Sequence, residues 1–262
     1  MMDEEIKLIH GDGGKYTDLL INEVFYKHFG NELLLTKSDA SVFEVEGKLA
    51  FTTDSFVVKP LIFPGGDIGK LAVCGTINDL ATSGAEPLYL SCGFMIEEGM
   101  KIELLERIVI SMAEVCKNTG AKIITGDTKV VEKGALDGVF INTSGIGIIR
   151  NGYKPKTIEI GDNIIITGGI GEHGTTIAIE RYNINVKGNF KSDCNPLNGV
   201  IKLLDKYMDD IKLMKDPTRG GLATILNEIA CKSSKNIKII EESIPIKPEV
   251  RWVNRLDRKS VV

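Results

Sequence analysis

At 262 residues with 43% hydrophobic composition, the chain is long enough for one large domain or two modest ones with a sizeable core. Its formal net charge of −4 argues against a non-specific nucleic-acid binder, which would be basic. No apolar run approaches the length that spans a bilayer, and the acidic opening MMDEEIKLIHG predicts no secretory signal. Five scattered cysteines without a CxxC pair indicate reduced thiols and a cytoplasmic protein, and only three histidines argue against a His/Cys zinc site.

The first half of the chain alternates helical and strand patterns. GKYTDLLINEVFYKHFG, residues 14–30, predicts an amphipathic helix, and ASVFEVEGKLAFTTDSFVV, residues 40–58, predicts a hairpin that turns at Glu46-Gly47. Asp67 is the expected N-cap of a helix over residues 68–83. The remaining expected elements are a strand over 87–96, a long helix over 101–119 that ends at Gly120, and strands over 121–125 and 138–149.

A polar, turn-rich stretch at residues 150–162 is the best candidate for a domain boundary. The second half predicts a strand over 163–167 and helices over 175–182, 195–211 and 220–232. Between the expected strand and the first of these helices, GGIGEHG places Gly169, Gly171 and Gly174 in the GxGxxG spacing of a dinucleotide-binding unit. The following stretch, 183–194, is too polar for the second buried strand of such a unit, so a purely structural glycine turn is the alternative. The pattern as a whole predicts two α/β layers joined near residue 155.

Five aspartates are candidates for a cation site, because carboxylates that converge from separate elements bind hard cations such as Mg²⁺ and couple them to phosphate. Four of them follow apolar or small stretches at expected strand ends or turns: Asp39, Asp54, Asp127 and Asp216. Taken singly, each of the four could be a cap or turn residue. Asp79 lies beside Asn78 in the middle of an apolar helix, where a buried carboxylate needs a partner; a backbone hydrogen bond is the alternative to a metal.

Two glycine-rich helix starts could bind anions. HGDGGKY puts Lys15 directly after three glycines, where backbone amides and the helix dipole favour phosphate, although the spacing is not that of a Walker A loop. DPTRGGL places Asp216 and Arg219 before a helix that begins with glycines. The alternatives are a flexible N-terminal arm for the first and a simple capping turn for the second.

Together, these motifs resemble the HypE family of hydrogenase maturation proteins, in the superfamily of PurM-like aminoimidazole ribonucleotide synthetase and selenophosphate synthetase. The matching stretches, in order, are HGDGGK, FTTDSFVVKPLIFPGGDIGKLAVCGTINDLATSGAEPLYLSCGF, TGDTKVV, FINTSGIG, GEHGTTI, SDC, DPTRGGL and IPIKPEVR. The resemblance implies a two-domain PurM-like α/β (α+β) fold. Residues 1–154 would bind ATP and contribute strands to a dimeric β-barrel, residues 155–250 would form an incomplete second α/β domain, and residues 251–262 an atypical tail.

The resemblance also implies which residues act, with ATP in the cleft between the domains. Mg²⁺ and phosphate would be held by four carboxylates: Asp39, Asp54, Asp79 and Asp216. The nucleotide would meet Lys15, Asp54, Asn78, Asp127, Thr128 and Arg219. Lys129 is implied as the group that removes a proton from nitrogen, with Asp79 as the second catalytic residue.

The implied reaction is ATP-dependent dehydration of an S-carboxamide on a C-terminal cysteine to a thiocyanate, which supplies cyanide to the iron of [NiFe]-hydrogenase. The implied partners are a second copy of the chain, the carbamoyltransferase HypF and the HypC–HypD complex. The final stretch RWVNRLDRKSVV departs from the family pattern, which continues to a cysteine, so the chain as given is expected to lack the carrier thiol and to be inactive. A non-catalytic ATP-binding scaffold and a selenophosphate synthetase-like phosphotransferase are the alternatives; the glycine loop HGDGGK lacks the cysteine or selenocysteine of the latter.

Overall fold

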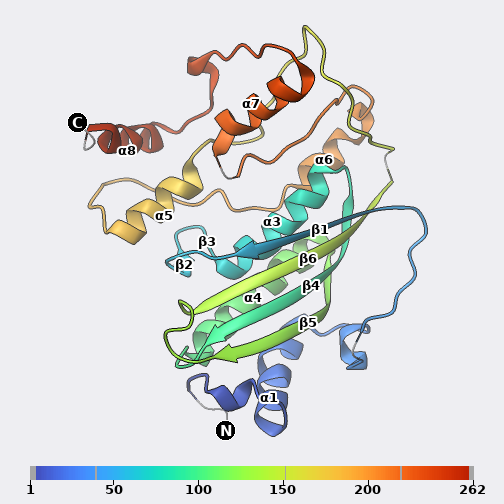
Figure 1. Ribbon diagram of the computed structural model, residues 1–262, viewed down its shortest axis with the longest axis vertical. Helices are drawn as coiled ribbons and strands as arrows, with labels where there is room; N and C mark the ends of the chain where they lie inside the picture. Colours follow the sequence, from blue (N-terminus) through green and yellow to red (C-terminus); the bar gives the residue numbers. More distant parts are fainter. Residues whose placement is uncertain (1–3, 39, 151, 219, 260–262) are drawn as a thin grey trace.

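A computed structural model describes residues 4–38, 40–150, 152–218 and 220–259. Its centre is a four-stranded sheet in the order β1-β6-β4-β5, in which the β1–β6 and β4–β6 pairs are antiparallel and the β4–β5 pair is parallel (Figure 1). The strands are β1 (Lys48–Phe56), β4 (Glu86–Glu97), β5 (Lys122–Val131) and β6 (Val139–Ile149). The predicted strands over 87–96 and 138–149 are confirmed, and β5 continues six residues beyond the predicted 121–125.

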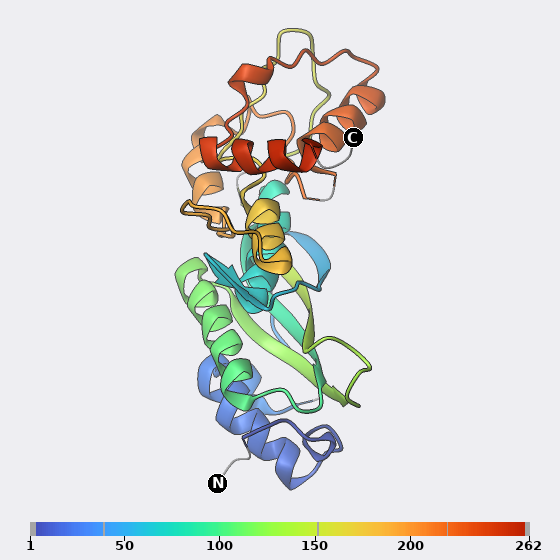
Figure 2. The same ribbon diagram turned by 90° about the vertical axis from the view of Figure 1, so that its left-hand side faces the viewer.

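Two helices cover one face of this sheet and leave the other face open (Figure 2). The helix α3 (Ile68–Thr82) packs against β1 and β6, and α4 (Ile102–Thr119) packs beside α3. Asp67 caps α3 as predicted, because its carboxylate accepts a hydrogen bond from the Lys70 backbone N–H at 2.9 Å. The α4 helix ends as predicted at Gly120, which adopts φ +80°. Before α3, β2 (Ile62–Phe63) and β3 (Gly66–Asp67) form a short separate ribbon.

The predicted N-terminal helix is confirmed as one continuous helical segment. It consists of α1 (Lys15–Leu20), a π-helical turn (Ile21–Tyr26) and α2 (Lys27–Phe29), and it packs on α4 and β5. Short 3₁₀ turns precede and follow it at Leu8–His10 and Leu34–Thr36. The segment therefore covers the β5 edge of the sheet, at the opposite end of the molecule from the second half of the chain (Figure 1).

In its described part, the second half consists of helices and irregular segments, without strands. It contains α5 (Glu172–Tyr182), α6 (Asn198–Leu204), α7 (Gly221–Ser233) and α8 (Pro248–Lys259), with 3₁₀ turns at Asp205–Tyr207 and Glu241–Ser243. The helices predicted over 175–182 and 220–232 are confirmed, while the one predicted over 195–211 is shorter and ends in a 3₁₀ turn. Residues 251–259, expected as part of a tail, are the last part of α8. Across all described residues, no helix combines the length and the apolar character needed to cross a membrane.

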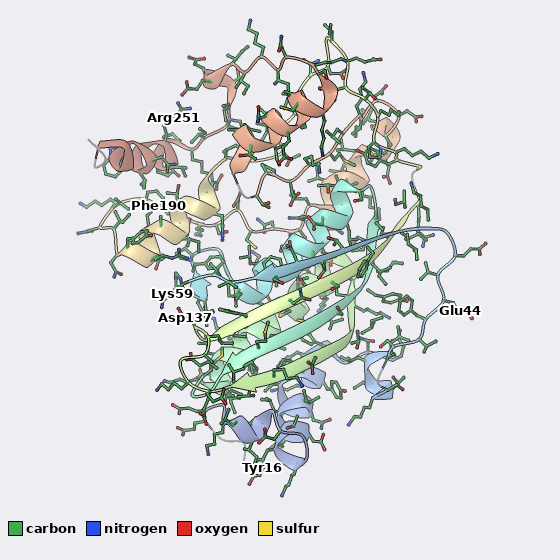
Figure 3. All side chains as sticks on the ribbon, in the orientation of Figure 1. Tyr16, Glu44, Lys59, Asp137, Phe190 and Arg251 are labelled. Carbon is green, nitrogen blue, oxygen red and sulfur yellow. The ribbon has the colours of Figure 1, made fainter. Side chains whose placement is uncertain are left out.

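Two predicted strands are wrong. Residues 41–46, the expected first arm of a hairpin, form an irregular segment without strand pairing, and β1 pairs with β6 instead. Ser41 and Phe43 still contact the sheet, through the Ile124 carbonyl and the Tyr89 ring, whereas Glu44 lies to one side of it in Figure 3. Residues 163–167 form no strand either, and Ile165 is 86% exposed. An alternation of apolar and polar residues, or a short apolar run, predicts an extended backbone. A strand also needs a neighbouring strand that completes its hydrogen bonds, and local sequence does not specify that neighbour.

The contact between α3 and α4 depends on a glycine. A Cβ atom added at Gly69 would lie 2.6 Å from the Ile108 carbonyl oxygen and 2.7 Å from Met112 Cγ. These distances are far inside van der Waals contact, so a side chain at this position would push the two helices apart.

We therefore expect Gly69→Ala to lower the free energy of unfolding by about 1–3 kcal/mol, the usual cost of overpacking a core. Gly174→Ala is the matched control, because Gly174 lies in α5 and a Cβ there would meet no atom within 4 Å. Since alanine favours helix over glycine by roughly 0.5–1 kcal/mol, the control should be neutral or stabilising. Urea unfolding measures both variants, and equal stabilities would contradict the close helix contact.

Candidate functional site

Asp79 lies in α3, where its carboxylate has a side-chain partner. Thr52 on β1 donates a hydrogen bond from Oγ1 to Asp79 Oδ2 at 2.7 Å. Asp79 is half-buried, so the expectation of a fully buried carboxylate is wrong, and its carboxylate is bonded to a hydroxyl and not to the backbone. The sequence correctly predicted that Asp79 lies within a helix, but it could not predict that a strand hydroxyl stands opposite.

Two glycine contacts hold α3 close enough to the sheet for this bond to form. A Cβ at Gly75 would lie 2.7 Å from the Phe56 ring, and a Cβ at Gly145 would lie 2.7 Å from Thr76 Cγ2. Gly145 is the β6 residue directly opposite Thr52 in the sheet. Because both glycines lack a side chain, α3 packs directly on β1 and β6, and Asp79 comes within hydrogen-bond reach of Thr52.

Three of the predicted acidic residues come together at this point. Asp54 lies two residues after Thr52 on β1 and therefore on the same, helix-covered face, and its Oδ2 would lie 3.7 Å from a Cβ at Gly75. Asp216 comes from the loop before α7 in the second half. Burial, followed by the negative charges of Asp79 and Asp54, raises the pKa of Asp216 to about 6. Asp54 and Asp79 of the first half thus repel the Asp216 carboxylate of the second half.

This set of oxygens fits a hard cation that is shared with a phosphate. Within the described ranges, no three His, Cys, Asp or Glu side chains approach closely enough to enclose a metal ion by themselves. Mg²⁺ seldom needs such an enclosure, because it typically takes one or two carboxylates and completes its octahedron with water and substrate phosphate oxygens. The carboxylates of Asp54, Asp79 and Asp216 are the right donors for that arrangement, whereas Asp39 and Arg219 lie outside the described residues.

Asn78, predicted to bind nucleotide, instead connects the two halves. Its Oδ1 accepts a hydrogen bond from the Leu197 backbone N–H at 2.8 Å, and its Nδ2 donates one to the Asn195 carbonyl at 3.2 Å. On the same side of α3, Lys70 Nζ donates to Asn195 Oδ1 at 3.4 Å. Both polar atoms of the Asn78 amide are thereby used, so this residue holds residues 195–197 against α3, next to Asp79.

The predicted residues of β5 lie elsewhere on the sheet. Asp127 and Lys129 project from the open face, 3.9 Å apart between Oδ1 and Nζ, and Asp127 is within the strand and not at a strand end as expected. Thr128 projects from the opposite face, opposite the buried Phe94. Asp127 is three strands from β1, which is roughly 14 Å at about 4.8 Å per strand. Within one chain, Asp127 and Lys129 therefore do not join Asp54 and Asp79.

Lys15 is also separated from the carboxylates. It is the first residue of α1, directly after Gly13 and Gly14, which both have positive φ. The α1 helix lies at the opposite end of the molecule from α6 and α7 in both views, and Figure 3 shows Tyr16 there, far from Arg251 (Figures 1–3). Lys15 therefore reaches neither Asp79 nor Asp216 within one chain.

The glycine motif at residues 168–174 does not form a dinucleotide-binding unit. Neither residues 163–167 before it nor residues 183–194 after it form a strand, so both strands of the expected βαβ unit are missing from this described segment. His173 in this motif contacts Ser192 Oγ through Nδ1 at 2.9 Å and packs edge-on against the Phe63 ring. Burial lowers the pKa of His173, which suits a packed, neutral imidazole between the halves.

All five cysteines lie in the described part of the chain, and four of them are buried: Cys74, Cys92, Cys116 and Cys194. Burial raises the pKa of Cys116 to about 12 and that of Cys92 above its usual range, so these thiols are poor nucleophiles. Cys231 is exposed on α7, within the helix predicted for it.

Comparison with known proteins assigns both halves to one group. The family described as AIR synthase related protein, N-terminal domain, matches residues 37–149, and its C-terminal domain matches residues 159–257. The chain is 48% identical to the carbamoyl dehydratase HypE of Rhizobium leguminosarum bv. viciae, over 94% of this chain and 71% of that protein. It is 44% identical to the carbamoyl dehydratase HypE of Escherichia coli K12, over 96% of this chain and 77% of that protein.

Solved structures agree with these relatives. A crystal structure of a hydrogenase maturation protein HypE in complex with ATP superposes with a TM-score of 0.91 at 45% identity, covering 96% of this chain and 76% of that one. The chain also superposes on a crystal structure of a HypE–HypF complex with a TM-score of 0.77 at 48% identity, covering 91% of this chain and 78% of that one.

The raised pKa of Asp216 predicts a measurable pH effect on the metal-free protein. Because its pKa is higher in the folded than in the unfolded state, the folded chain binds more protons between about pH 4 and pH 6, and this group makes stability fall as pH rises through that window. Asp216→Asn should therefore be more stable than wild type at pH 8, by on the order of 1 kcal/mol after allowing for solvent screening, with the difference vanishing towards pH 4.

Urea unfolding at pH 4.5 and at pH 8, without magnesium or nucleotide, measures this difference. Asp209→Asn is the control, because the Asp209 side chain is fully exposed. If Asp216→Asn has the same stability as wild type at both pH values, the three carboxylates do not interact.

Proposed function

Because the chain belongs to the HypE family of AIR synthase-related proteins, we propose that it catalyses the ATP-dependent dehydration of a cysteine S-carboxamide to a thiocyanate, which supplies cyanide for [NiFe]-hydrogenase maturation. The observation that carries the proposal is the convergence of Asp54, Asp79 and Asp216 from both halves of the chain, in a fold that closely matches an ATP complex of the same family. Carboxylates alone would repel one another there, and a magnesium nucleotide would remove that repulsion.

The chemistry requires ATP because a carboxamide oxygen is a poor leaving group. Transfer of the γ-phosphoryl group to that oxygen breaks the bond to ADP and converts the oxygen into part of a phosphate. Departure of the phosphate, with loss of both protons from the amide nitrogen, leaves the carbon–nitrogen triple bond of the thiocyanate. A reaction of this kind asks the protein mainly to position the phosphoryl group, to stabilise its charge and to accept a proton.

The residues can be assigned to these tasks. Asp54, Asp79 and Asp216 would hold Mg²⁺, which neutralises charge on the transferring phosphoryl group when it is bound. Asp39, Arg219 and Thr128 remain proposed contacts of the metal and nucleotide. Asn78 would act indirectly, by holding the second half beside Asp79. Four of the five cysteines are buried and Cys231 lies within α7, so we assign the substrate thiol to none of them.

Lys129, Asp127 and Lys15 would complete the site only in a homodimer. They lie away from the carboxylates of their own chain, and Asp127 and Lys129 share the open sheet face with exposed apolar side chains, among them Phe51 at 71% and Met95 at 41% exposed. An open, partly apolar sheet face is a suitable surface for a second copy. There, Lys129 could lose contact with water and become a more effective base for the amide proton.

Two further partners belong to this proposal. A related HypE has been crystallised with HypF, and on this basis the carbamoyltransferase HypF would deliver the carbamoyl group to the substrate cysteine. The HypC–HypD complex would then receive the cyanide.

The proposal predicts that this chain binds Mg·ATP through Asp79. Calorimetric titration should show saturable binding to the wild-type chain, and Asp79→Asn should weaken it at least about tenfold, because removal of a carboxylate ligand leaves Mg²⁺ with one fewer charged oxygen. Asp137→Asn, a 63% exposed carboxylate that pairs with Lys59 at another end of the sheet, should bind as wild type does (Figure 3). A folded Asp79 variant with unchanged affinity would refute the assigned site.

A further inference from the structure

We propose that Thr52 is a positioning residue for the magnesium site: its hydroxyl holds one oxygen of Asp79 and so orients the other oxygen for the cation. This inference rests on the proposed function above. Its basis is the 2.7 Å hydrogen bond from Thr52 Oγ1 to Asp79 Oδ2. A threonine hydroxyl has a single proton to donate, and here that proton is committed to the carboxylate.

The hydroxyl is held rigidly from the strand side. Thr52 lies in the middle of β1, paired with Gly145 of β6, and as a β-branched residue in a strand it has few side-chain rotamers. It is half-buried under α3, so solvent competes with the bond less than at the surface.

The carboxylate is held from the helix side as well. The backbone carbonyl of Asp79 accepts hydrogen bonds from Thr82 Oγ1 at 2.9 Å and from Ser83 Oγ at 3.3 Å, and α3 itself is packed on the sheet through Gly75 and Gly145. With the backbone of Asp79 fixed, rotation of its carboxylate group is the main freedom left. The bond from Thr52 removes that freedom, because it fixes the position of Oδ2.

The orientation of this carboxylate matters because Mg²⁺ accepts little deviation from octahedral geometry. Side chains that orient a metal ligand through a hydrogen bond typically change metal affinity by 10–100-fold when they are removed. Loss of the Thr52 hydroxyl should therefore reduce the affinity for Mg²⁺ and leave metal-free nucleotide contacts unchanged.

The neighbouring threonine provides a matched control. Thr53 is also on β1 but projects from the open face, where its hydroxyl accepts a hydrogen bond from Ser144 Oγ at 2.9 Å. Thr52→Val and Thr53→Val remove the same group from adjacent positions of one strand, and only the first removes a contact to Asp79. Thr52→Ser retains the hydroxyl and should restore the function if the hydroxyl is what matters.

The experiment measures the Mg²⁺ concentration that half-saturates ATP binding at fixed ATP, by calorimetry, and urea unfolding of each variant without metal. Thr52→Val should raise the half-saturating Mg²⁺ concentration at least about tenfold. Thr52→Ser should keep this concentration within about threefold of the wild-type value, and Thr53→Val should leave it unchanged. In an Asp79→Asn background, Thr52→Val should have little further effect, since both substitutions act on the same contact.

The outcomes separate this inference from the proposed function. If ATP binding to the wild-type chain depends on Mg²⁺, and a folded Thr52→Val variant shows the same dependence, only the role of Thr52 is overturned. A Thr52→Ser variant as defective as Thr52→Val overturns it too, because the hydroxyl would then not be the group that acts. Failure of the wild-type chain to bind Mg·ATP at all overturns the proposed function, and the inference with it.

Discussion

The mutual repulsion of Asp54, Asp79 and Asp216 is the constraint on which the rest of the site depends. One carboxylate comes from a strand, one from a helix and one from a loop of the second half. Burial, followed by the charges of Asp79 and Asp54, raises the pKa of Asp216 to about 6. This repulsion by itself lowers the stability of the fold. Its persistence is explained if a cation normally lies among the three groups and converts their repulsion into attraction.

The α3 helix makes this arrangement possible through its small residues. Gly69 allows contact with α4, and Gly75 allows contact with Phe56 of β1, so the helix is buried between sheet and neighbouring helix along most of its length. Its last two turns then perform two tasks with adjacent residues. Asn78 holds the backbone of the second half, and Asp79 presents its carboxylate beside Thr52, so the placement of Asp216 and the geometry of the cation site depend on the same helix.

Sequence alone predicted the helices and central strands of the first half well, because caps such as Asp67 and long amphipathic patterns are local signals. It did not predict pairing partners, so residues 41–46 and 163–167 were assigned to strands they do not form. Among the acidic candidates, Asp54, Asp79 and Asp216 come together and Asp127 does not, because residue type alone does not show which face of a strand carries a side chain. Strand alternation places Thr52 on the same face as Asp54, a signal that the motif FTTDS contains and that becomes meaningful only once α3 is known to cover that face.

The most direct test of a cation among these carboxylates is a crystal structure of the chain grown with Mn²⁺ and a non-hydrolysable ATP analogue. Manganese prefers the same oxygen ligands as magnesium and can be located by its anomalous scattering. An anomalous peak is expected within coordination distance of Asp79 and of at least one of Asp54 and Asp216, next to the phosphates. A nucleotide bound with its metal away from all three carboxylates would contradict it.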